Sequence, residues 1–359
     1  MRRRKNKWFC DVAKYSDVVL SSSVSLSRNF LDYEFPAKLK EEKATELVEH
    51  MRSLMGDLAL IEGVSFYSCR VDKLNNIEKD SMIECHTITP SMKRKKEPVG
   101  LIFSEDEGIS IMVNDDDHLR IQAQVAGNNL RKAYKTANRL DDYFDSVMQY
   151  CYSDKFGYLT SKPQDTGTGM KASYILSLPA LTMGGKIETL QEEVNRFGVV
   201  LQGTYGEGSK STGFVFQISN RKTLGVSEND ILENLEQVVA QIINIERKAR
   251  RDLLNANHDE MADRMYRSYG VLKYAKLLSQ KDAMLLLAQL KLGCDVGVLK
   301  LKDGGAGIYR LMIESRPGNL QKIEGKSLGS RDRDRVRAEY LNENLPEFDE
   351  PVTDGDEAK

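Results

Sequence analysis

The stretch VGLIFSEDEGISIMVNDDDHLRIQAQV, from Val99 to Val125, predicts the fold class of this chain. Apolar residues alternate with other residues in three runs, as expected of β-strands that bury one face. The polar turn Ser104 to Gly108 separates the first two runs, and the acidic segment Asn114 to Asp117 separates the last two. Because such short connections join antiparallel strands, the stretch predicts a hairpin followed by a third antiparallel strand.

Further strands and helices are predicted on both sides of this stretch. A second hairpin is expected from Val199 to Ile218, and Asp17 to Ser21 is expected to be a short buried strand that runs into a serine-rich turn. Asn129 to Tyr150 has the period of an amphipathic helix, and Ser227 with Asp230 forms a capping box that opens another helix. Hairpins and helices without βαβ alternation predict an α+β fold with an antiparallel sheet.

The composition changes along the chain in a way that predicts four segments. Residues 1–16 form a basic N-terminal segment, and residues 17–255 contain the predicted sheet. Asp259 to Gly293 is almost purely helical in pattern, so residues 256–345 are predicted to form a helical domain. Residues 346–359 form an acidic tail that we expect to be disordered. We therefore place a domain boundary near residue 255.

Bulk composition narrows the class of protein. The chain has 359 residues and a formal net charge of -2, so charge gives no argument for binding nucleic acid or a membrane. Its five cysteines are scattered without a CxxC pair, which is typical of reduced thiols in the cytosol. The basic N-terminus is not followed by an apolar region, and no apolar run has the length of a membrane span. These features predict a cytoplasmic protein.

Five segments, in order along the chain, resemble motifs of one enzyme superfamily. They are DVVLSSSVSLSRN (Asp17 to Asn29), NDDDHLRIQ (Asn114 to Gln122), FGYLTSKPQDTGTGMKAS (Phe156 to Ser173), QGTYGEGS (Gln202 to Ser209) and RDRVRA (Arg333 to Ala338). The first four resemble segments of the ATP:guanidino phosphotransferases that read SSRVRLARN, NEEDHLRIQ, CPTN before GTG with RAS after it, and RGIYGEGS. The fifth matches the RDxxRA motif of the bacterial protein-arginine kinase (McsB) branch.

The resemblance implies a phosphagen-kinase-like catalytic domain, in which an antiparallel sheet is flanked by helices. It also implies a mainly helical C-terminal domain that carries dimerisation and phosphoarginine recognition in the family. The family moves the γ-phosphoryl group of ATP, with magnesium, to a guanidinium group. Such chemistry needs cationic forks on the phosphates and a carboxylate to hold the acceptor.

The resemblance also places the family's site residues on this sequence. The catalytic carboxylates correspond to Asp116 and Glu207, and Lys162 stands at the position of the reactive cysteine. The ATP-binding positions correspond to Ser21, Ser22, Ser23, Val24, Ser25, His86, Arg120, Lys171, Ala172, Ser173, Gln202, Gly203, Tyr205, Gly206 and Glu207.

Most of the family's charged groups are replaced at these positions. Ser23, Ser25 and Gln202 stand where the family has arginines, and Lys171 replaces a fourth arginine. Arginine suits phosphate binding because it donates two parallel hydrogen bonds and stays charged. A single arginine aimed at the transition state can be worth on the order of 10³–10⁵ in rate. The replacements therefore predict a loss of phosphate binding and of catalysis.

Two functional interpretations follow. In the leading one, the chain is a pseudokinase that binds phosphoarginine-marked proteins and acts as a regulator or adaptor for Clp-type proteolysis. In the alternative, it is an active ATP-dependent kinase that phosphorylates arginine side chains of proteins. Glu207 is compatible with a surviving substrate contact or with an ordinary turn residue, which we weigh evenly.

The C-terminal run RDRVRA is compatible with two interpretations, a phosphoarginine pocket as in the family or a solvated helix face. In the family the motif lines a phosphoarginine pocket, which here would comprise Arg333, Asp334, Arg337 and Ala338. Taken alone, alternating charges on a helix more often form a solvated face. We favour phosphoarginine binding because paired arginines suit a phosphoryl group. We expect Arg337 to be exposed. Its replacement by alanine should therefore abolish phosphoarginine binding while leaving the fold intact.

The remaining expectations concern partners and metals. The resemblance implies arginine-phosphorylated or arginine-rich proteins, a Clp chaperone-protease and a zinc-binding activator as partners, and a homodimer. A membrane and nucleic acid are not expected. Asp115 to Asp117 is a contiguous acidic trio with no further partner, which is a weak signal for metal, so no resident metal is predicted. His118 is expected to be a structural histidine that braces this acidic loop.

Overall fold

A large antiparallel sheet forms the centre of the protein. The computed structural model describes residues 7–10, 17–204 and 211–349. Eight strands pair in the order β2-β3-β4-β5-β1-β8-β10-β9, and all neighbours are antiparallel. Their bounds are β1 Val19–Arg28, β2 Phe66–Arg70, β3 Gly100–Ser104, β4 Ile109–Val113, β5 Leu119–Ala126, β8 Met170–Ser177, β9 Val199–Gly203 and β10 Val215–Asn220. A separate small hairpin is formed by β6 Tyr152–Ser153 and β7 Gly157–Tyr158.

Helices surround the sheet and continue into a second, helical region. Those that accompany the sheet are α1 Glu41–Ser53, α2 Met55–Glu62, α3 Asn76–Glu84, α4 Pro90–Arg94, α5 Leu130–Val147, α6 Pro179–Met183, α7 Ile187–Arg196 and α8 Glu228–Ala256. The helical region contains α9 His258–Tyr274, α10 Gln280–Asp295, α11 Ile308–Glu314, α12 Pro317–Glu324 and α13 Ser330–Asn344. Two short 3₁₀ helices are η1 Trp8–Cys10 and η2 Val71–Lys73. The predicted α+β class, with a helical C-terminal part, is confirmed.

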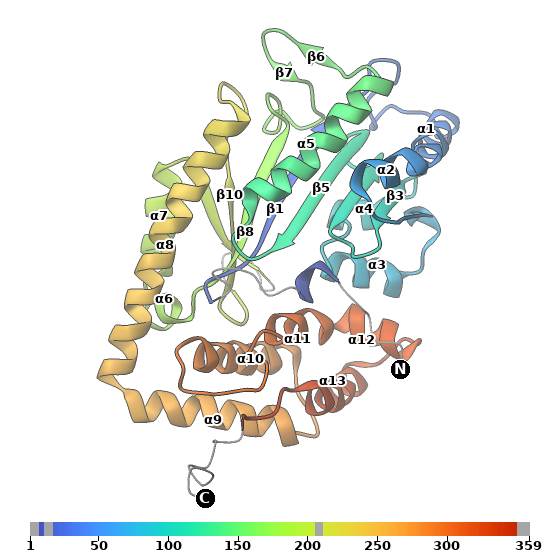
Figure 1. The fold of residues 1–359 in the computed structure, drawn as a ribbon. Coiled ribbons are helices and arrows are strands. Elements are labelled where there is room, and N and C mark those ends of the chain that lie inside the picture. Colours follow the sequence, from blue (N-terminus) through green and yellow to red (C-terminus); the bar gives the residue numbers. More distant parts are fainter. Residues whose placement is uncertain (1–6, 11–16, 205–210, 350–359) are drawn as a thin grey trace, which may run out of the picture.

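The central strands alternate between a core face and an open face. Val24 and Leu26 of β1 point into the main apolar core, which α5 and α8 cover from one side (Figure 1). The intervening residues Ser23, Ser25 and Ser27 point to the opposite face of the sheet. β1 continues through these residues, is ten residues long and lies in the middle of the sheet. The prediction that the chain turns after Ser21 is wrong, because the serines alternate with apolar residues along a continuing strand.

Other predicted elements agree with the structure to within a few residues. The hairpin and third strand expected from Val99 to Val125 are β3, β4 and β5. The capping box of Ser227 and Asp230 opens α8, with both reciprocal hydrogen bonds present. The predicted boundary near residue 255 lies at the end of α8. Phe348 falls in the tail that we expected to be disordered, but its ring lies 4.3 Å from the ring of Tyr269, so that expectation is wrong for Phe348.

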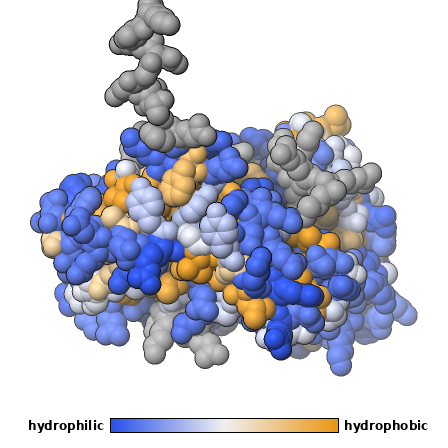
Figure 2. Space-filling model, turned by 90° about the horizontal axis from the view of Figure 1, so that it is seen from below, coloured by the Kyte–Doolittle hydropathy of each residue, from blue (hydrophilic) through white to orange (hydrophobic). Residues whose placement is uncertain are grey.

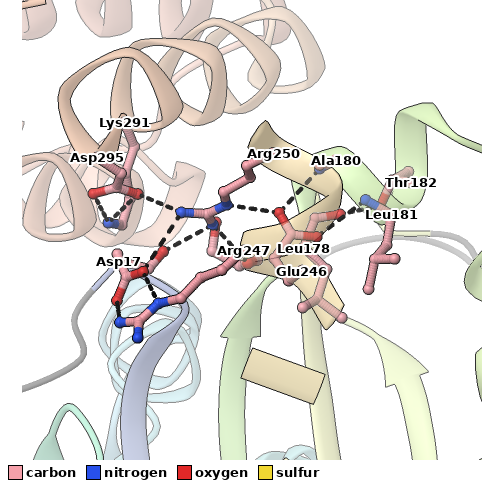
Figure 3. Close-up of polar contacts among 11 residues, drawn as sticks. Asp17, Leu178, Ala180, Leu181, Thr182, Glu246, Arg247, Arg250, Lys291 and Asp295 are labelled. Carbon is pink, nitrogen blue, oxygen red and sulfur yellow. Dashed lines mark hydrogen bonds and ion pairs between the residues drawn. The ribbon is translucent and has the colours of Figure 1, made fainter. Parts of the chain in front are cut away.

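A largely buried ion cluster joins the sheet region to the helical region. Its residues come from the segment just before β1, the second half of α8 and the end of α10 (Figure 3). They are Asp17, Glu246, Arg247, Arg250, Lys291 and Asp295. Arg250 lies at the centre: it donates to Glu246 at 2.7 Å and to the carbonyl of Asp17 at 2.9 Å. Because its carboxylates and cations neutralise one another, the cluster fixes how the two regions sit together.

The N-terminal segment contributes a second connection. Trp8 and Phe9 are both buried, and η1 lies between the sheet and the C-terminal helices (Figure 1). Lys7 pairs with Glu107 at 2.5 Å at the turn between β3 and β4. Trp8 packs edge-on against Tyr309 of α11, with ring centroids 6.4 Å apart. In the described residues, no helix combines the length and the apolar character needed to cross a membrane.

Candidate functional site

The predicted phosphate-binding positions lie together on the open face of the sheet. On β1, Ser23 pairs with Ser173 of β8, and Ser25 pairs with Lys171 of β8. Arg120 of β5 reaches the same face, because Leu119 and Ile121 on either side of it point into the core. Gln202 of β9 is likewise exposed beside β10. The structure therefore brings polar residues from four strands, β1, β5, β8 and β9, to one surface.

Some of the family positions have structural tasks in this chain. Val24 and Ala172 are buried in the core, and Ser21 is also buried. Ser22 accepts a hydrogen bond from the backbone of Asn129 at 2.9 Å and donates to the carbonyl of Gly127 at 2.5 Å, so it anchors the loop before α5. Gly203 ends β9. Tyr205, Gly206 and Glu207 lie outside the described residues.

The serine hydroxyls on the open face bind one another and their neighbours. The hydroxyls of Ser23 and Ser173 are 2.8 Å apart, and Gln217 donates to the Ser173 hydroxyl at 3.2 Å. Ser25 accepts a hydrogen bond from Arg120 at 3.2 Å. Neutral hydroxyls cannot supply the paired, charged donors that a polyphosphate needs. The strand positions are thus satisfied internally rather than directed at a ligand.

Lys171 and Arg120 have no ion pair on this face among the residues that the structure describes. Partial desolvation, and then the positive charge of Arg120, lower the pKa of Lys171. Among the described residues, the Nε of Arg120 is buried and has no hydrogen-bond partner. An unmade hydrogen bond at a buried atom costs free energy, so Arg120 is less well satisfied here than the serine hydroxyls beside it.

His86 lies beside these strands in an unusual conformation. Its φ angle is 60°, and its carbonyl accepts a hydrogen bond from Gln122 of β5 at 2.6 Å. Desolvation, and then the positive charge of Arg316, lower the pKa of His86 to about 4. The imidazole is therefore neutral at physiological pH and adds no positive charge to the site.

Asp116, the predicted acceptor-binding carboxylate, is already paired within the chain. The ammonium of Lys162 lies 2.5 Å from Asp116 Oδ2. This hydrogen bond is the main cause of a raised pKa for Lys162. Lys162 lies 46 residues after Asp116, in the segment that follows β7. An in-chain cation thus occupies the carboxylate that would hold an incoming guanidinium.

The neighbouring acidic residues have separate structural tasks. Asp115 is buried and accepts hydrogen bonds from the hydroxyls of Thr89 at 2.7 Å and Ser91 at 2.5 Å. Asp117 accepts hydrogen bonds from the side chain of Asn29 at 2.7 Å and the backbone of Ser161 at 2.6 Å. In the described part of the chain, no group of three or more potential ligand side chains could hold a metal ion.

His118 is structural, as expected, but it braces a different segment. Its Nδ1 accepts a hydrogen bond from the backbone of Phe30 at 3.1 Å, so its Nε2 donates to the carbonyl of Glu34 at 2.8 Å. Burial lowers the pKa of His118. The ring therefore holds the segment after β1, rather than the acidic loop itself.

The C-terminal motif differs from expectation in the exposure of one arginine. Arg337 is only 1% exposed, so the prediction that it is exposed is wrong. Its guanidinium donates to the carbonyls of Ser315 at 2.9 Å and Leu278 at 2.8 Å, and to Asp334 at 2.7 Å. Burial lowers its pKa, and the charge of Arg333 lowers it further. Arg333 is half-buried and nearby, whereas Ala338 is fully buried.

A contact between the end of α3 and the start of α12, which the sequence did not suggest, links the helical region to the sheet region. The Glu84 carboxylate, at the end of α3, accepts hydrogen bonds from the backbone of Gly318 and Asn319, both at 2.8 Å. It thereby caps the N-terminus of α12, and burial raises its pKa. Glu84 closely precedes His86, so α12 holds the segment that carries the histidine. An isolated glutamate near a helix end gave no signal for this.

Comparison with known proteins defines the class first. A family model described as "ATP:guanido phosphotransferase, C-terminal catalytic domain" matches residues 46–249. Lombricine kinase has a similar structure, with a TM-score of 0.55 and 20% identity over 68% of this chain and 69% of that one. The duplicated taurocyamine kinase of Schistosoma mansoni has a TM-score of 0.57 and 21% sequence identity, over 68% of this chain and 35% of that one. These structures show the fold alone.

Full-length relatives then define the family. A model described as "Protein-arginine kinase McsB C-terminal domain" matches residues 258–356. The protein-arginine kinase of Desulforamulus reducens is 38% identical over 341 residues, which cover 95% of each chain. That of Bacillus subtilis is 37% identical over 341 residues, or 95% of this chain and 93% of the relative. The chain belongs to the protein-arginine kinase family of ATP:guanido phosphotransferases.

Proposed function

We propose that this chain is a catalytically impaired protein-arginine kinase homologue that binds arginine-phosphorylated proteins. The observation that carries the first half is the ion pair between Lys162 and Asp116. A substrate guanidinium would have to displace the ammonium before reaching the carboxylate. The cation would also repel a positively charged acceptor at the same place.

The phosphate side supports the same proposal. Ser23, Ser25 and Gln202 are neutral and cannot donate the paired, charged hydrogen bonds of an arginine to a phosphate. A charge-assisted hydrogen bond contributes roughly 1.5–3 kcal/mol. Loss of three such contacts removes more than about 4 kcal/mol of binding. The residues present therefore do not fit a tightly bound ATP with magnesium, the phosphoryl donor that the family implies. We assign no catalytic step to it in this chain.

The alternative function is an active protein-arginine kinase. It is favoured by the names of the relatives and by the presence of Arg120 at a position where the family has a phosphate-binding arginine. An active enzyme would need Lys162 to swing away from Asp116. That pair is partly exposed, with 54% and 28% of the two side chains accessible, so the movement itself would cost little. The missing arginines at Ser23, Ser25 and Gln202 add to the Lys162–Asp116 pair, and together they favour the impaired homologue over this alternative.

A phosphorylation assay separates the two functions. The purified chain, incubated with ATP, magnesium and casein, should form no acid-labile phosphoarginine above background. The Bacillus subtilis relative serves as the positive control. Turnover that is abolished by Asp116→Asn or Glu207→Ala would refute the proposal. In calorimetry, ATP with magnesium should show no micromolar affinity, since the clamps are missing.

Recognition of phosphoarginine is proposed for the surface around Arg333. Because Arg337 is committed to buried carbonyls, Arg333 would supply the donors to a phosphoryl group, with Asp334 nearby for the guanidinium end. Free phosphoarginine should raise the melting temperature by mass action. Arg333→Ala should abolish that shift, whereas Arg331→Ala, exposed two residues earlier, should not. A phosphoarginine shift that is as large in Arg333→Ala as in the wild type would contradict the proposal.

The partners follow from this proposal. Phosphoarginine-bearing clients would be presented to a Clp-type protease in the cytoplasm, and a zinc-binding activator of the family is a further candidate partner. A homodimer through the helical region is also proposed. On that side of the molecule, apolar side chains lie among hydrophilic ones (Figure 2). Tyr274 and Leu277, at and after the end of α9, are 74% and 52% exposed.

A further inference from the structure

A cavity of about 270 Å³ lies where the sheet region meets the helical region. Phe9, Leu20 and Tyr309 line it with apolar surface, and all three are buried. Its charged lining residues are Lys291, Asp295 and Asp303. None of these residues belongs to the predicted kinase site or to the RDRVRA motif, so the cavity is a separate feature.

The charges of the cavity favour a positively charged ligand. Lys291 is neutralised by Asp295, whose two oxygens lie 2.8 and 2.9 Å from its ammonium. Arg250 also forms an ion pair with Asp295, at 3.4 Å, as part of the ion cluster of Figure 3. The described lining residues include one cation and two carboxylates, so Asp303 gives this part of the lining a net charge of -1. A ligand cation would compensate that charge.

Asp303 is placed to accept such a cation. Its side chain accepts backbone hydrogen bonds from Gly305 at 2.9 Å and Gly307 at 3.0 Å, one on each oxygen. A carboxylate oxygen has capacity for a second bond, so both oxygens can still receive donors. The two backbone bonds fix the orientation of the carboxylate, and the residue is exposed. Two oriented oxygens match the planar fork of a guanidinium better than the single point of an ammonium.

We propose that this cavity binds the guanidinium side chain of an arginine in another polypeptide. The aliphatic stem would lie against Leu20 and the two aromatic rings. A guanidinium also stacks favourably on aromatic faces, which Phe9 and Tyr309 can offer. The site would hold an unphosphorylated arginine, because a phosphoryl group would meet Asp295 and Asp303. This inference does not depend on whether the kinase site is active.

The chain carries its own reporter for the test. Trp8 is the single tryptophan, and its ring lies 5.5 Å from that of Phe9 and 6.4 Å from that of Tyr309. Titration with Nα-acetyl-L-arginine amide should change its fluorescence in a saturable way. The matched citrulline compound, which replaces the guanidinium with a neutral urea, should bind at least about tenfold more weakly.

Variants locate the binding to this cavity. Asp303→Asn should weaken binding about tenfold, because the charge-assisted bonds are lost. Ala306→Phe, at an exposed position of the lining, should obstruct the cavity and abolish binding. Asp332→Asn, exposed on α13, is the matched control and should bind normally, as should Asp116→Asn in the kinase site.

Three outcomes would overturn the inference. They are an absence of saturable binding, equal affinity for the arginine and citrulline compounds, and unchanged affinity in both Asp303→Asn and Ala306→Phe. Tighter binding of free L-arginine than of the capped compound would overturn the assignment to a polypeptide. Circular dichroism of each variant shows whether it is folded, and Ala306→Phe keeps the test valid if Asp303→Asn disturbs its turn.

Discussion

Replacement of Arg337 by alanine should destabilise the helical region strongly. Arg337 is 1% exposed, and its guanidinium holds the carbonyls of Ser315 and Leu278 at 2.9 and 2.8 Å. Without it, two buried acceptors would lose charged donors, at about 1.5–3 kcal/mol each. The side chain of Asp334 is 32% exposed and can be hydrated, so the loss of its ion pair adds little to the destabilisation. The expected loss in the free energy of unfolding is about 3–5 kcal/mol.

Urea unfolding followed by circular dichroism measures this loss, with Arg335→Ala as the matched control on the same helix. Arg335 makes an exposed pair with Asp332 at 3.3 Å, so its removal should cost less than about 0.5 kcal/mol. A loss below about 1 kcal/mol for Arg337→Ala would refute the reasoning, because the buried carbonyls would then have found other donors. A large loss would make this variant unsuitable for testing phosphoarginine binding, which is why Arg333 is the residue to change.

Three further predictions follow from the ion pairs and the histidine. Lys162→Met should free Asp116 with a stability change under about 0.5 kcal/mol in urea unfolding, since the pair is partly exposed, and should leave the chain inactive in the casein assay. Arg250→Met should cost about 3–5 kcal/mol of unfolding free energy in the same experiment, because it strands buried carboxylates; a loss under about 1 kcal/mol would contradict this. Between pH 4 and about 6.5 stability should rise with pH, because the unfolded chain protonates His86 while the folded chain, with its pKa lowered to about 4, does not. His86→Gln should flatten that rise in urea midpoints measured across the range, and an unchanged slope would count against the lowered pKa.

The sheet was predictable where its signal is local. Between Val99 and Val125 each strand alternates by itself and the connections are short, so the pattern determines both strands and pairing. β1 carries the same alternation in Val24 and Leu26, but intervening serines are also typical of turns, and this hid it. β2 gave no clear signal, because it is an edge strand in which only Phe66 is buried.

The motifs predicted positions that the structure places on one face of the sheet, but the contacts among them could not be predicted. The motifs placed Lys162 near a cationic substrate's position, yet the pair with Asp116 joins residues 46 positions apart and requires the folded loop. The burial of Arg337 likewise depends on carbonyls 22 and 59 residues away. Alternating charges on α13 looked like a solvated face, and no local pattern distinguishes a buried arginine there.

The replaced positions in the kinase site compensate for one another. Deleting a buried cation normally leaves its partner uncompensated, at a cost of several kcal/mol. Here Asp116 has gained Lys162 as its partner, and the hydroxyls of Ser23 and Ser173 satisfy each other. Substitutions that only eroded the site would have left unpaired groups at each of these places. Among the described residues of this face, Lys171 has no ion pair and the Nε of Arg120 has no hydrogen-bond partner, so the internal pairing is complete at the serines and at Asp116 but not at these two cations.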